Sequence, residues 1–358
     1  MGDDPLTGKN FDHRKAWMED ELQRLAACFG IDLLTFAILS NHFHLILRSR
    51  PDVVQAWSDE EVARRWLMLC PYRKDEEGRA KDPKESEISS IAKDSKRLTE
   101  IRSRLSDISW WMRLLSQSIA QRANRDDKEV GKFWQARFKA VRLLDETAVL
   151  ACSAYVDLNP IRAAIAETVE GSDYTSVQRR ALSQRVRAKS KVVKSTAGDD
   201  SQAKAESSKP ASQSKSDAML APITIDELHD AIGAVPSKSS SRASDKGYLP
   251  MTLASYLDLL NFTAHQVRVV KQSQSRKGHS KRGQSEHDKP KRVQPPSAAD
   301  SVFRRLGISQ EVWLELVNRF DQLFYTVAGK PESVDARRTR DGTHRHKAKL
   351  HARQLLKA

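Results

Sequence analysis

The hydrophobic pattern of the first 180 residues predicts helices alternating with short strands. Helical spacing, short apolar runs and period-two alternation predict five elements: a helix at residues 12–29, strands at 31–39 and 42–48, a helix at 106–124, and a strand or hairpin at 131–144. Ser40-Asn41 provides the turn between the two strands. Asp145 is a good N-cap for a further helix, which has Ala148, Ala151 and Cys152 on one side. Residues 58–104 are polar and charged and predict no clear element.

The remainder of the chain alternates between low-complexity segments and amphipathic helices. Ser, Lys, Gln and Ala dominate residues 181–218, which we expect to form a disordered linker. Basic, Ser-rich residues 271–300 predict a second linker, and residues 331–358 a basic tail. Between them we expect helical modules at 219–270 and 301–330. Their N-caps are Thr252 and Ser309, and the second helix is expected to stop at Gly329.

Composition narrows the class of protein. The 358 residues include 61 Lys plus Arg and 47 Asp plus Glu, a net charge of +14 that predicts a polyanionic partner without separating DNA, RNA and anionic lipid. No apolar run approaches the ~18 residues of a membrane span, and the polar N-terminus is unlike a secretory signal. Three cysteines, Cys28, Cys70 and Cys152, are too few for a disulfide framework. We therefore expect a cytoplasmic protein with no membrane partner.

His42 and His44 are the first candidates for chemistry. Side chains at positions i and i+2 of a strand point to the same side, so both imidazoles would face away from Phe43, Leu45 and Leu47. Two imidazoles on a rigid strand can share one metal ion. Spacing alone does not exclude the simpler interpretation, a structural or accidental pair.

Tyr155 and Asn159 are the second pair. Residues four apart share a helix face, and the preceding turns of that face are small, which lets the helix lie close to a sheet. This packing would bring both polar groups toward the histidines. The residue before Pro160 avoids the α region, so we expect Asn159 at the helix end. The simpler interpretation is a half-buried tyrosine and a C-terminal cap.

Together these residues resemble the HUH endonuclease superfamily, and specifically its single-tyrosine transposases close to the REP-associated tyrosine transposases. The resemblance rests on AILSNHFHLILR (37–48), GKFWQARFKA (131–140) and AYVDLNPIRA (154–163), in that order, followed by SDYTSV (172–177). It covers roughly residues 12–180 and implies one transposase domain at 1–180. The resemblance implies an α+β fold with a ferredoxin-like antiparallel sheet, here followed by a C-terminal helical extension. That family has a strand before its first helix, and no strand-like segment precedes residue 12, so we expect the sheet to lack it.

The resemblance also implies a mechanism. By position, His42, His44 and Asn159 match the ligands of Mg²⁺ or Mn²⁺, and Tyr155 matches the nucleophile that forms a 5′-phosphotyrosine on single-stranded or hairpin DNA. Such an enzyme nicks and rejoins DNA in transposition or on repetitive palindromic elements, as a monomer or a homodimer. Two alternatives stay open: a DNA-binding relative that has lost cleavage, and a replication initiator or relaxase. Tyr174 is a competing nucleophile that we rank lower, because it lies past Pro160 in a turn region.

Several side chains could contact DNA through phosphate or base stacking. They flank the proposed site in sequence: Arg113, Arg122, Trp134, Arg137, Lys139 and Arg162. Arg137 and Lys139 are expected to alternate with Trp134 across a strand. The competing interpretation is a solvated basic face.

Overall fold

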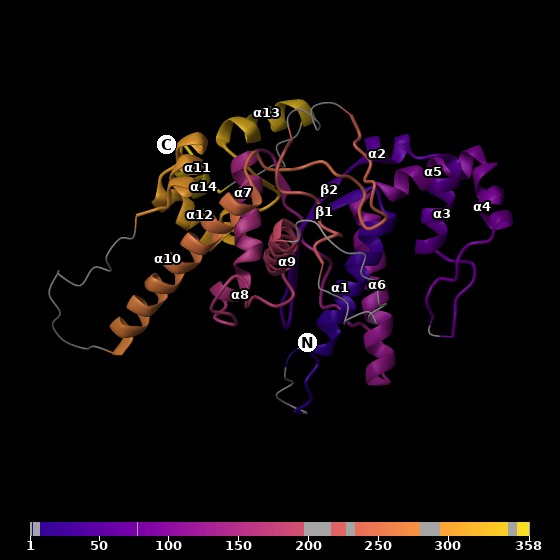
Figure 1. The fold of residues 1–358 in the computed structure, drawn as a ribbon, viewed down its shortest axis with the longest axis horizontal. Helices are drawn as coiled ribbons and strands as arrows, with labels where there is room; N and C mark the ends of the chain where they lie inside the picture. Colours follow the sequence, from indigo (N-terminus) through magenta and orange to yellow (C-terminus); the bar gives the residue numbers. More distant parts are fainter. Residues whose placement is uncertain are drawn as a thin grey trace.

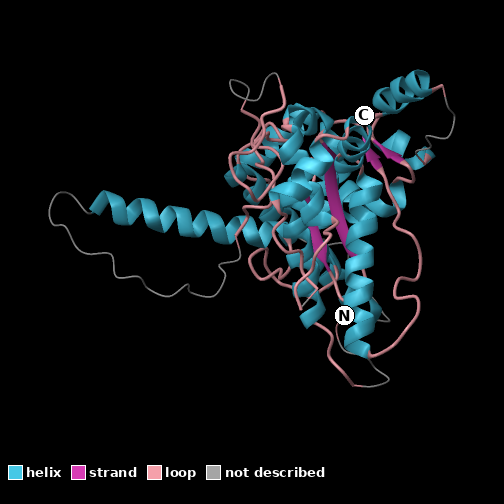
Figure 2. Ribbon diagram, turned by 90° about the vertical axis from the view of Figure 1, so that its right-hand side faces the viewer, coloured by secondary structure: helices cyan, strands magenta, loops and turns pink. Residues whose placement is uncertain are grey.

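The computed structural model describes residues 2, 8–76, 78–196, 216–226, 233–279, 294–342 and 349–357. Helices and strands are mixed, as predicted for an α+β protein. A two-stranded antiparallel sheet lies between two groups of helices (Figures 1 and 2). In Figure 1, α1 and α6 are on one side of the sheet and α7 with the C-terminal helices on the other. No helix among the described residues has the length and apolarity needed to cross a membrane.

The first helix and the two strands lie where the sequence predicts them. They are α1 (His13–Cys28), β1 (Ile31–Ile38) and β2 (Phe43–Ser49), and α6 (Ile108–Asp127) confirms the next predicted helix. A short helix, α2 (Pro51–Ala56), follows β2, and the region 58–104 that the sequence left unassigned holds three more, α3 (Asp59–Leu69), α4 (Glu85–Ala92) and α5 (Ser95–Leu105). Two of them have side-chain N-caps, Ser58 and Asp94, but their apolar faces are too short to stand out among so many charges.

Both faces of the sheet are covered. All residues of β1 are buried, and β1 pairs with β2 in a register that runs from Ile31 opposite Ser49 to Ile38 opposite Phe43. A shift in register between Leu33 and Thr35 changes the phase of the alternation. Because side chains on both faces of β1 are buried, the strand appears in sequence as a largely apolar run rather than as an alternating one.

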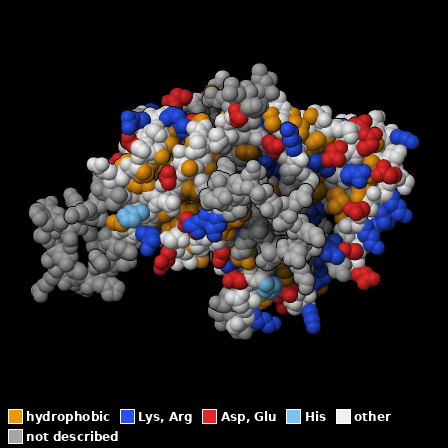
Figure 3. Space-filling view, in the orientation of Figure 1, with side chains coloured by type: hydrophobic (Ala, Val, Ile, Leu, Met, Phe, Trp, Pro, Cys, Tyr) orange, Lys and Arg blue, Asp and Glu red, His pale blue; other side chains and the backbone are white. Residues whose placement is uncertain are grey.

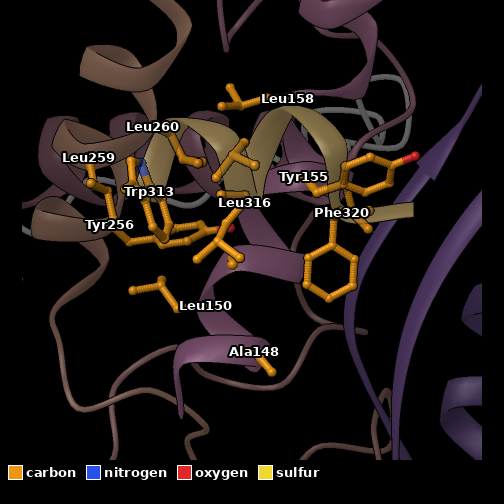
Figure 4. Close-up of a cluster of buried hydrophobic side chains, with 14 of the residues drawn as sticks. Ala148, Leu150, Tyr155, Leu158, Tyr256, Leu259, Leu260, Trp313, Leu316 and Phe320 are labelled. Atoms are coloured by element: carbon orange, nitrogen blue, oxygen red, sulfur yellow. The ribbon is translucent and has the colours of Figure 1, made fainter. Parts of the chain in front are cut away.

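Two hydrophobic cores result. The N-terminal core joins β1 and β2 to α1–α6 and includes Met18, Leu22, Leu33, Phe36, Trp111 and Leu115. The tyrosine core joins the other face of the sheet to α7 (Glu146–Asp157), α10 (Leu253–His279), α11 (Ser297–Leu306) and α12 (Gln310–Leu323) and includes Leu34, Ile46, Ala151, Tyr155, Tyr256, Trp313 and Phe320 (Figure 4). The C-terminal extension therefore shares a core with the predicted transposase domain.

The prediction of a strand or hairpin at residues 131–144 is wrong except at the C-terminal end of that segment. Only β3 (Arg142–Leu143) is a strand, and it pairs in parallel with β4 (Val327–Ala328) of the extension. Among the described residues, the β1–β2 sheet offers the segment no further strand partner. Trp134 instead anchors the irregular chain to α6, because its Nε1–H donates to the Ser116 carbonyl at 2.9 Å.

The predicted linker at 181–218 is also wrong at its start. After α7 and α8 (Asn159–Arg162), the helix α9 runs over Ser176–Thr196. Ala, Arg, Lys and Gln are good helix formers, so a composition typical of a linker also suits an exposed helix. Residues 197–215 lie outside the described residues.

The C-terminal helices begin at the predicted caps. Thr252 Oγ1 accepts from the Ser255 amide at the start of α10, and Ser309 Oγ accepts from the Val312 amide at the start of α12. Helix α12 ends at Leu323, short of the predicted stop, because the chain turns into β4. The predicted linker at 271–300 overlaps α10 and α11, and the predicted tail contains α13 (Pro331–Asp341) and α14 (Leu350–Leu355). Residues 280–293 and 343–348 lie outside the description.

The edge of β1 that faces away from β2 is closed by two distant segments. The Ile38 amide donates to the Tyr174 carbonyl at 3.0 Å, and the Ala221 amide donates to the Leu33 carbonyl at 3.0 Å. Between these two contacts a side chain pairs with the strand: the Phe36 amide donates to Ser176 Oγ at 3.0 Å.

Arg180 joins the same edge to the extension. Its fully buried guanidinium donates to the carbonyls of Leu34 and Ala221, both at 2.9 Å. The buried Asp157 accepts from the Ser176 hydroxyl and, at 2.6 Å, from the Tyr256 hydroxyl of α10. The edge, α7, α9 and α10 therefore form one polar network inside the molecule.

We predict that Arg180→Ala lowers the free energy of unfolding by about 3–5 kcal/mol, the range found when one partner of a buried charged network is removed. The variant leaves two buried carbonyls without their donor and Asp157 without the nearest cation. The matched control is Arg187→Ala on the exposed side of α9, which should change the free energy by less than about 0.5 kcal/mol. Urea denaturation followed by circular dichroism measures both, and equal values would contradict the role of Arg180.

Candidate active site

The structure brings the two histidines together at the start of β2. His42 directly precedes the strand and His44 is its second residue, and their ring centroids are 5.0 Å apart with ring planes at 84°. Phe43 points to the opposite face, where its ring lies 5.7 Å from Trp134. The pair therefore faces α7, on the side of the tyrosine core.

The two imidazoles have different environments. His42 is exposed, and its Nδ1 lies 2.6 Å from Asn41 Oδ1, which leaves Nε2 free of that contact. His44 Nε2 is buried and has no hydrogen-bond partner among the described residues. Burial, together with the charges of His42 and Arg162, lowers the pKa of His44 to about 4. His44 is therefore neutral near pH 7, with a lone pair available to a ligand.

Tyr155 lies in the last turn of α7, against His44. The two ring centroids are 5.3 Å apart at an angle of 80°. The Arg162 guanidinium carbon lies 4.3 Å from the centre of the phenol ring, and the Phe320 ring lies 5.9 Å from it. In Figure 4 the Tyr155 hydroxyl points away from the other labelled side chains, toward the strand at the right. Cation, imidazole and phenol thus share one small site.

The tyrosine is held in its protonated form. Only 7% of Tyr155 is exposed, and burial, followed by the charge of Asp321, raises its pKa above the ordinary value. A hydrogen bond with Arg162 acts in the opposite direction. The phenol therefore requires local positive charge or proton removal before it can act as a nucleophile.

Asn159 lies at the break that Pro160 was expected to produce. Helix α7 ends at Asp157, and Asn159 is the first residue of α8. It is buried, and its side chain makes no hydrogen bond within the part of the chain that the structure describes. Asn159 therefore lies four residues beyond Tyr155, past the end of its helix, and no contact between its amide and His42 or His44 is found among the described residues.

The donor set suits a weakly held divalent cation. Among the described residues, no group of three or more His, Cys, Asp or Glu side chains is arranged to hold a metal. The candidates are therefore the two imidazoles and the Asn159 amide, and the unpartnered His44 Nε2 fits a ligand role. Mg²⁺ and Mn²⁺ keep several water or phosphate oxygens, so an incomplete protein shell does not exclude them.

Two other candidates point elsewhere. Asp157 is fully buried and is engaged by Ser176 and Tyr256, so it is not positioned as a base for Tyr155. Tyr174 packs against the N-terminal core, and its carbonyl accepts from the Ile38 amide. Tyr174 is therefore placed to support the sheet edge.

The predicted DNA contacts are dispersed. On α6, the guanidinium of Arg113 lies 4.9 Å from the Trp110 ring and that of Arg122 lies 4.2 Å from the Trp17 ring. Trp134 packs on Phe43, so these three lie on the side of the sheet opposite His44. This position argues against Trp134 as a base-stacking residue.

Arg162 is the only one of the predicted cations that the described structure places against Tyr155. Arg137 and Lys139 do not alternate across a strand, but both are exposed in the irregular segment, beside a half-exposed Phe138. On the face shown in Figure 3, Lys and Arg are interspersed with Asp and Glu rather than gathered into one patch. The net positive charge therefore does not by itself mark a DNA path.

Sequence reasoning missed the contribution of α12 to the site. Phe320 contacts the Tyr155 ring, Asp321 raises its pKa, and the Asn318 carbonyl accepts a hydrogen bond from Arg162. The sequence shows an amphipathic helix here, but helical periodicity does not reveal which surface will cover it.

Comparison with known proteins adds no relative. No family model matches the chain, and neither the search of curated proteins nor that of solved structures found a match.

We predict that His44 makes stability depend on pH between 6.5 and about 4. Its pKa is lowered in the folded chain, so the unfolded chain binds more protons in this window and the free energy of unfolding falls as pH falls. The loss should reach at most about 3 kcal/mol. Denaturation of wild type and His44→Gln from pH 7 to pH 4 measures it. His265→Gln, on the exposed side of α10, is the control. An equal pH slope in wild type and His44→Gln would contradict the prediction.

Proposed function

We propose that this chain is a metal-dependent enzyme of the HUH single-tyrosine type, which nicks and rejoins single-stranded or hairpin DNA as a transposase or a REP-associated relative. The observation that carries the proposal is the contact between Tyr155 and His44, whose ring also lies against His42. A phenol beside a histidine pair with a free buried nitrogen matches the chemistry of a metal-assisted tyrosine nucleophile.

Each residue has a distinct task in this proposal. His42, His44 and Asn159 would hold Mg²⁺ or Mn²⁺, which when bound polarises a phosphodiester and neutralises its developing charge. Tyr155 attacks the phosphorus, and its oxygen replaces the 3′ oxygen of the leaving strand, which departs as a free 3′-OH. Arg162 stacks on the phenol and favours its phenolate form. The phosphotyrosine bond conserves the energy needed for rejoining.

The arrangement of elements supports the same family. An antiparallel strand pair that bears the histidines, with the tyrosine helix on one face and α1 with α6 on the other, is compatible with a ferredoxin-like HUH domain. The edge of β1 that faces away from β2 is completed by segments 174–176 and 219–221 rather than by a full strand.

We predict that wild-type protein forms a covalent adduct with labelled single-stranded hairpin DNA in the presence of Mn²⁺, and that Tyr155→Phe abolishes it. The phenol oxygen is the only atom removed, so DNA binding should persist. Denaturing gel electrophoresis detects the adduct, and fluorescence anisotropy measures binding. Tyr72→Phe, which changes an exposed tyrosine, is the matched control and should leave the adduct unchanged.

The outcomes separate the competing interpretations. An adduct that persists in Tyr155→Phe would exclude this nucleophile. Binding without an adduct in the wild type would favour the second class of protein, a DNA-binding relative without cleavage activity.

We predict that binding of single-stranded DNA weakens with salt, and that the double variant Arg137→Ala and Lys139→Ala weakens this dependence. Each phosphate contact on a single strand contributes about −0.7 to the slope of log K against log salt, so the slope should become shallower by about 1.4. Arg113→Ala, whose guanidinium lies on the Trp110 ring of α6 on the side of the sheet opposite His44, is the control and should keep the wild-type slope. An unchanged slope in the double variant would exclude both residues as phosphate contacts.

A further inference from the structure

The last turn of α12 covers one face of the Tyr155 ring, while the hydroxyl of the proposed nucleophile points away from it (Figure 4). The Phe320 ring lies 5.9 Å from the Tyr155 ring, and it stacks in turn on Phe324 at 4.9 Å. Phe320 and Tyr155 are both buried, at 4% and 7% exposure. A phosphodiester that must reach the tyrosine from this side therefore meets a wall built by a helix more than 150 residues away in sequence. We call residues 320–326 the cover segment.

The cover segment joins the rest of α12 at a kink. Arg319 has φ −128° and ψ 22°, values outside the helical range, within an element that is otherwise helical. Before the kink, α12 is firmly placed, because Trp313 is fully buried and its Nε1–H donates to Thr263 Oγ1 of α10 at 2.9 Å. The break thus separates an anchored helix from the turn that contacts Tyr155.

The segment is anchored again at its other end. Val327–Ala328 pairs with β3, and the Lys330 amide donates to Asp145 Oδ2, at the N-cap of α7, at 2.6 Å. A Cβ atom at Gly329 would lie 2.7 Å from the same carboxylate oxygen, so glycine permits this approach. A movement between these anchors would therefore involve only the residues between Arg319 and β4, and it would carry the buried side chains of Leu323 and Phe324 together with Phe320.

The cover segment also carries a negative charge that would repel the phosphate groups of DNA. Asp321 is exposed on the cover segment, and its carboxylate lies close enough to raise the pKa of Tyr155 and to act on that of His44. A negative charge at this position repels a phosphate group. The neighbouring Asn318 carbonyl accepts a hydrogen bond from Arg162, the cation that lies on the phenol ring.

We propose that the cover segment occludes Tyr155 in the DNA-free protein and swings outward about Arg319 when single-stranded DNA enters the site. The ligand in this inference rests on the proposed function, whereas the occlusion rests on the packing. Opening removes Phe320 from the ring and Asp321 from the path of the phosphate, and the anchors at Trp313 and β4 keep the remaining structure in place.

Nitration of the full-length chain by tetranitromethane, quantified by mass spectrometry, tests the occlusion without requiring catalysis. Two internal standards are present: Tyr72 is 54% exposed and Tyr256 is fully buried. In the wild type we expect Tyr155 to react at a rate close to that of Tyr256. Phe320→Ala should raise its rate about tenfold, a factor that corresponds to about 1.4 kcal/mol. Tyr325→Ala, which truncates an exposed aromatic of the same segment, should leave it unchanged.

Two results would overturn the inference: Tyr155 nitrated in the wild type as fast as Tyr72, or an unchanged rate in a folded Phe320→Ala variant. If that variant does not fold, Phe320→Leu replaces it. Hydrogen exchange of the wild type gives an independent measurement. The amides of residues 320–326 should exchange faster than those of residues 313–318, and faster still with single-stranded hairpin DNA. Equal exchange in both segments, or no change with DNA, counts against a hinge at Arg319.

The same experiments separate this inference from the proposed function. If Phe320→Ala accelerates nitration but no variant forms a DNA adduct, the cover stands and the nicking activity fails. If wild type and Phe320→Ala form adducts at the same rate and nitration does not change, the activity stands and the cover fails.

Discussion

The outer edge of β1 is the constraint on which the rest of the structure depends. All of β1 is buried, so each amide and carbonyl that β2 does not pair must find another partner, or stability is lost. Among the described residues no full strand fills this role, and the groups are satisfied one at a time. Backbone from residues 174 and 221 takes the ends, and Ser176 and Arg180 take the middle.

This way of closing the edge of β1 explains why the C-terminal extension packs together with the first 180 residues. Arg180 reaches an edge carbonyl only because α9 lies against β1, and its second acceptor, the Ala221 carbonyl, comes from beyond the predicted linker. Asp157 offsets the buried cation and accepts from Tyr256 of α10, which brings the C-terminal helices onto α7. Asp157 is two residues from Tyr155. The network that closes the sheet therefore also fixes the turn of α7 that presents the tyrosine to His44.

The sequence predicted the features that depend on residues close to one another in the chain. The caps at Asp145, Thr252 and Ser309 are confirmed because a cap depends on residues close in sequence, and the two strands are confirmed because a short turn makes each the partner of the other. The opposed directions of His44 and Phe43 follow from the same period-two rule. Residues 131–141 were predicted as a strand and are irregular, because a strand requires a free partner edge, which is a property of the whole fold.

The contacts around Tyr155 were unpredictable for the same reason. Nothing near residue 320 in the sequence indicates that its aromatic side chain packs on residue 155, and α9 was hidden in a composition that suits a linker equally well. The two halves of the site were therefore accessible to different kinds of reasoning. Spacing indicated that the two histidines share one side of a strand, and the resemblance singled out Tyr155, whereas only the folded chain shows what surrounds them.

Burial has two opposed effects on this tyrosine. It raises the pKa of the phenol, which favours the neutral group, and in the proposed function it would also lower the local dielectric and so strengthen the attraction of Arg162 and of a bound metal ion for a phosphate. In that proposal a permanently exposed tyrosine would lose the second effect, and a permanently covered one could not meet its substrate. The proposed cover segment, anchored at Trp313 and β4 but interrupted at Arg319, would satisfy both requirements, because only the short turn between the anchors would have to move.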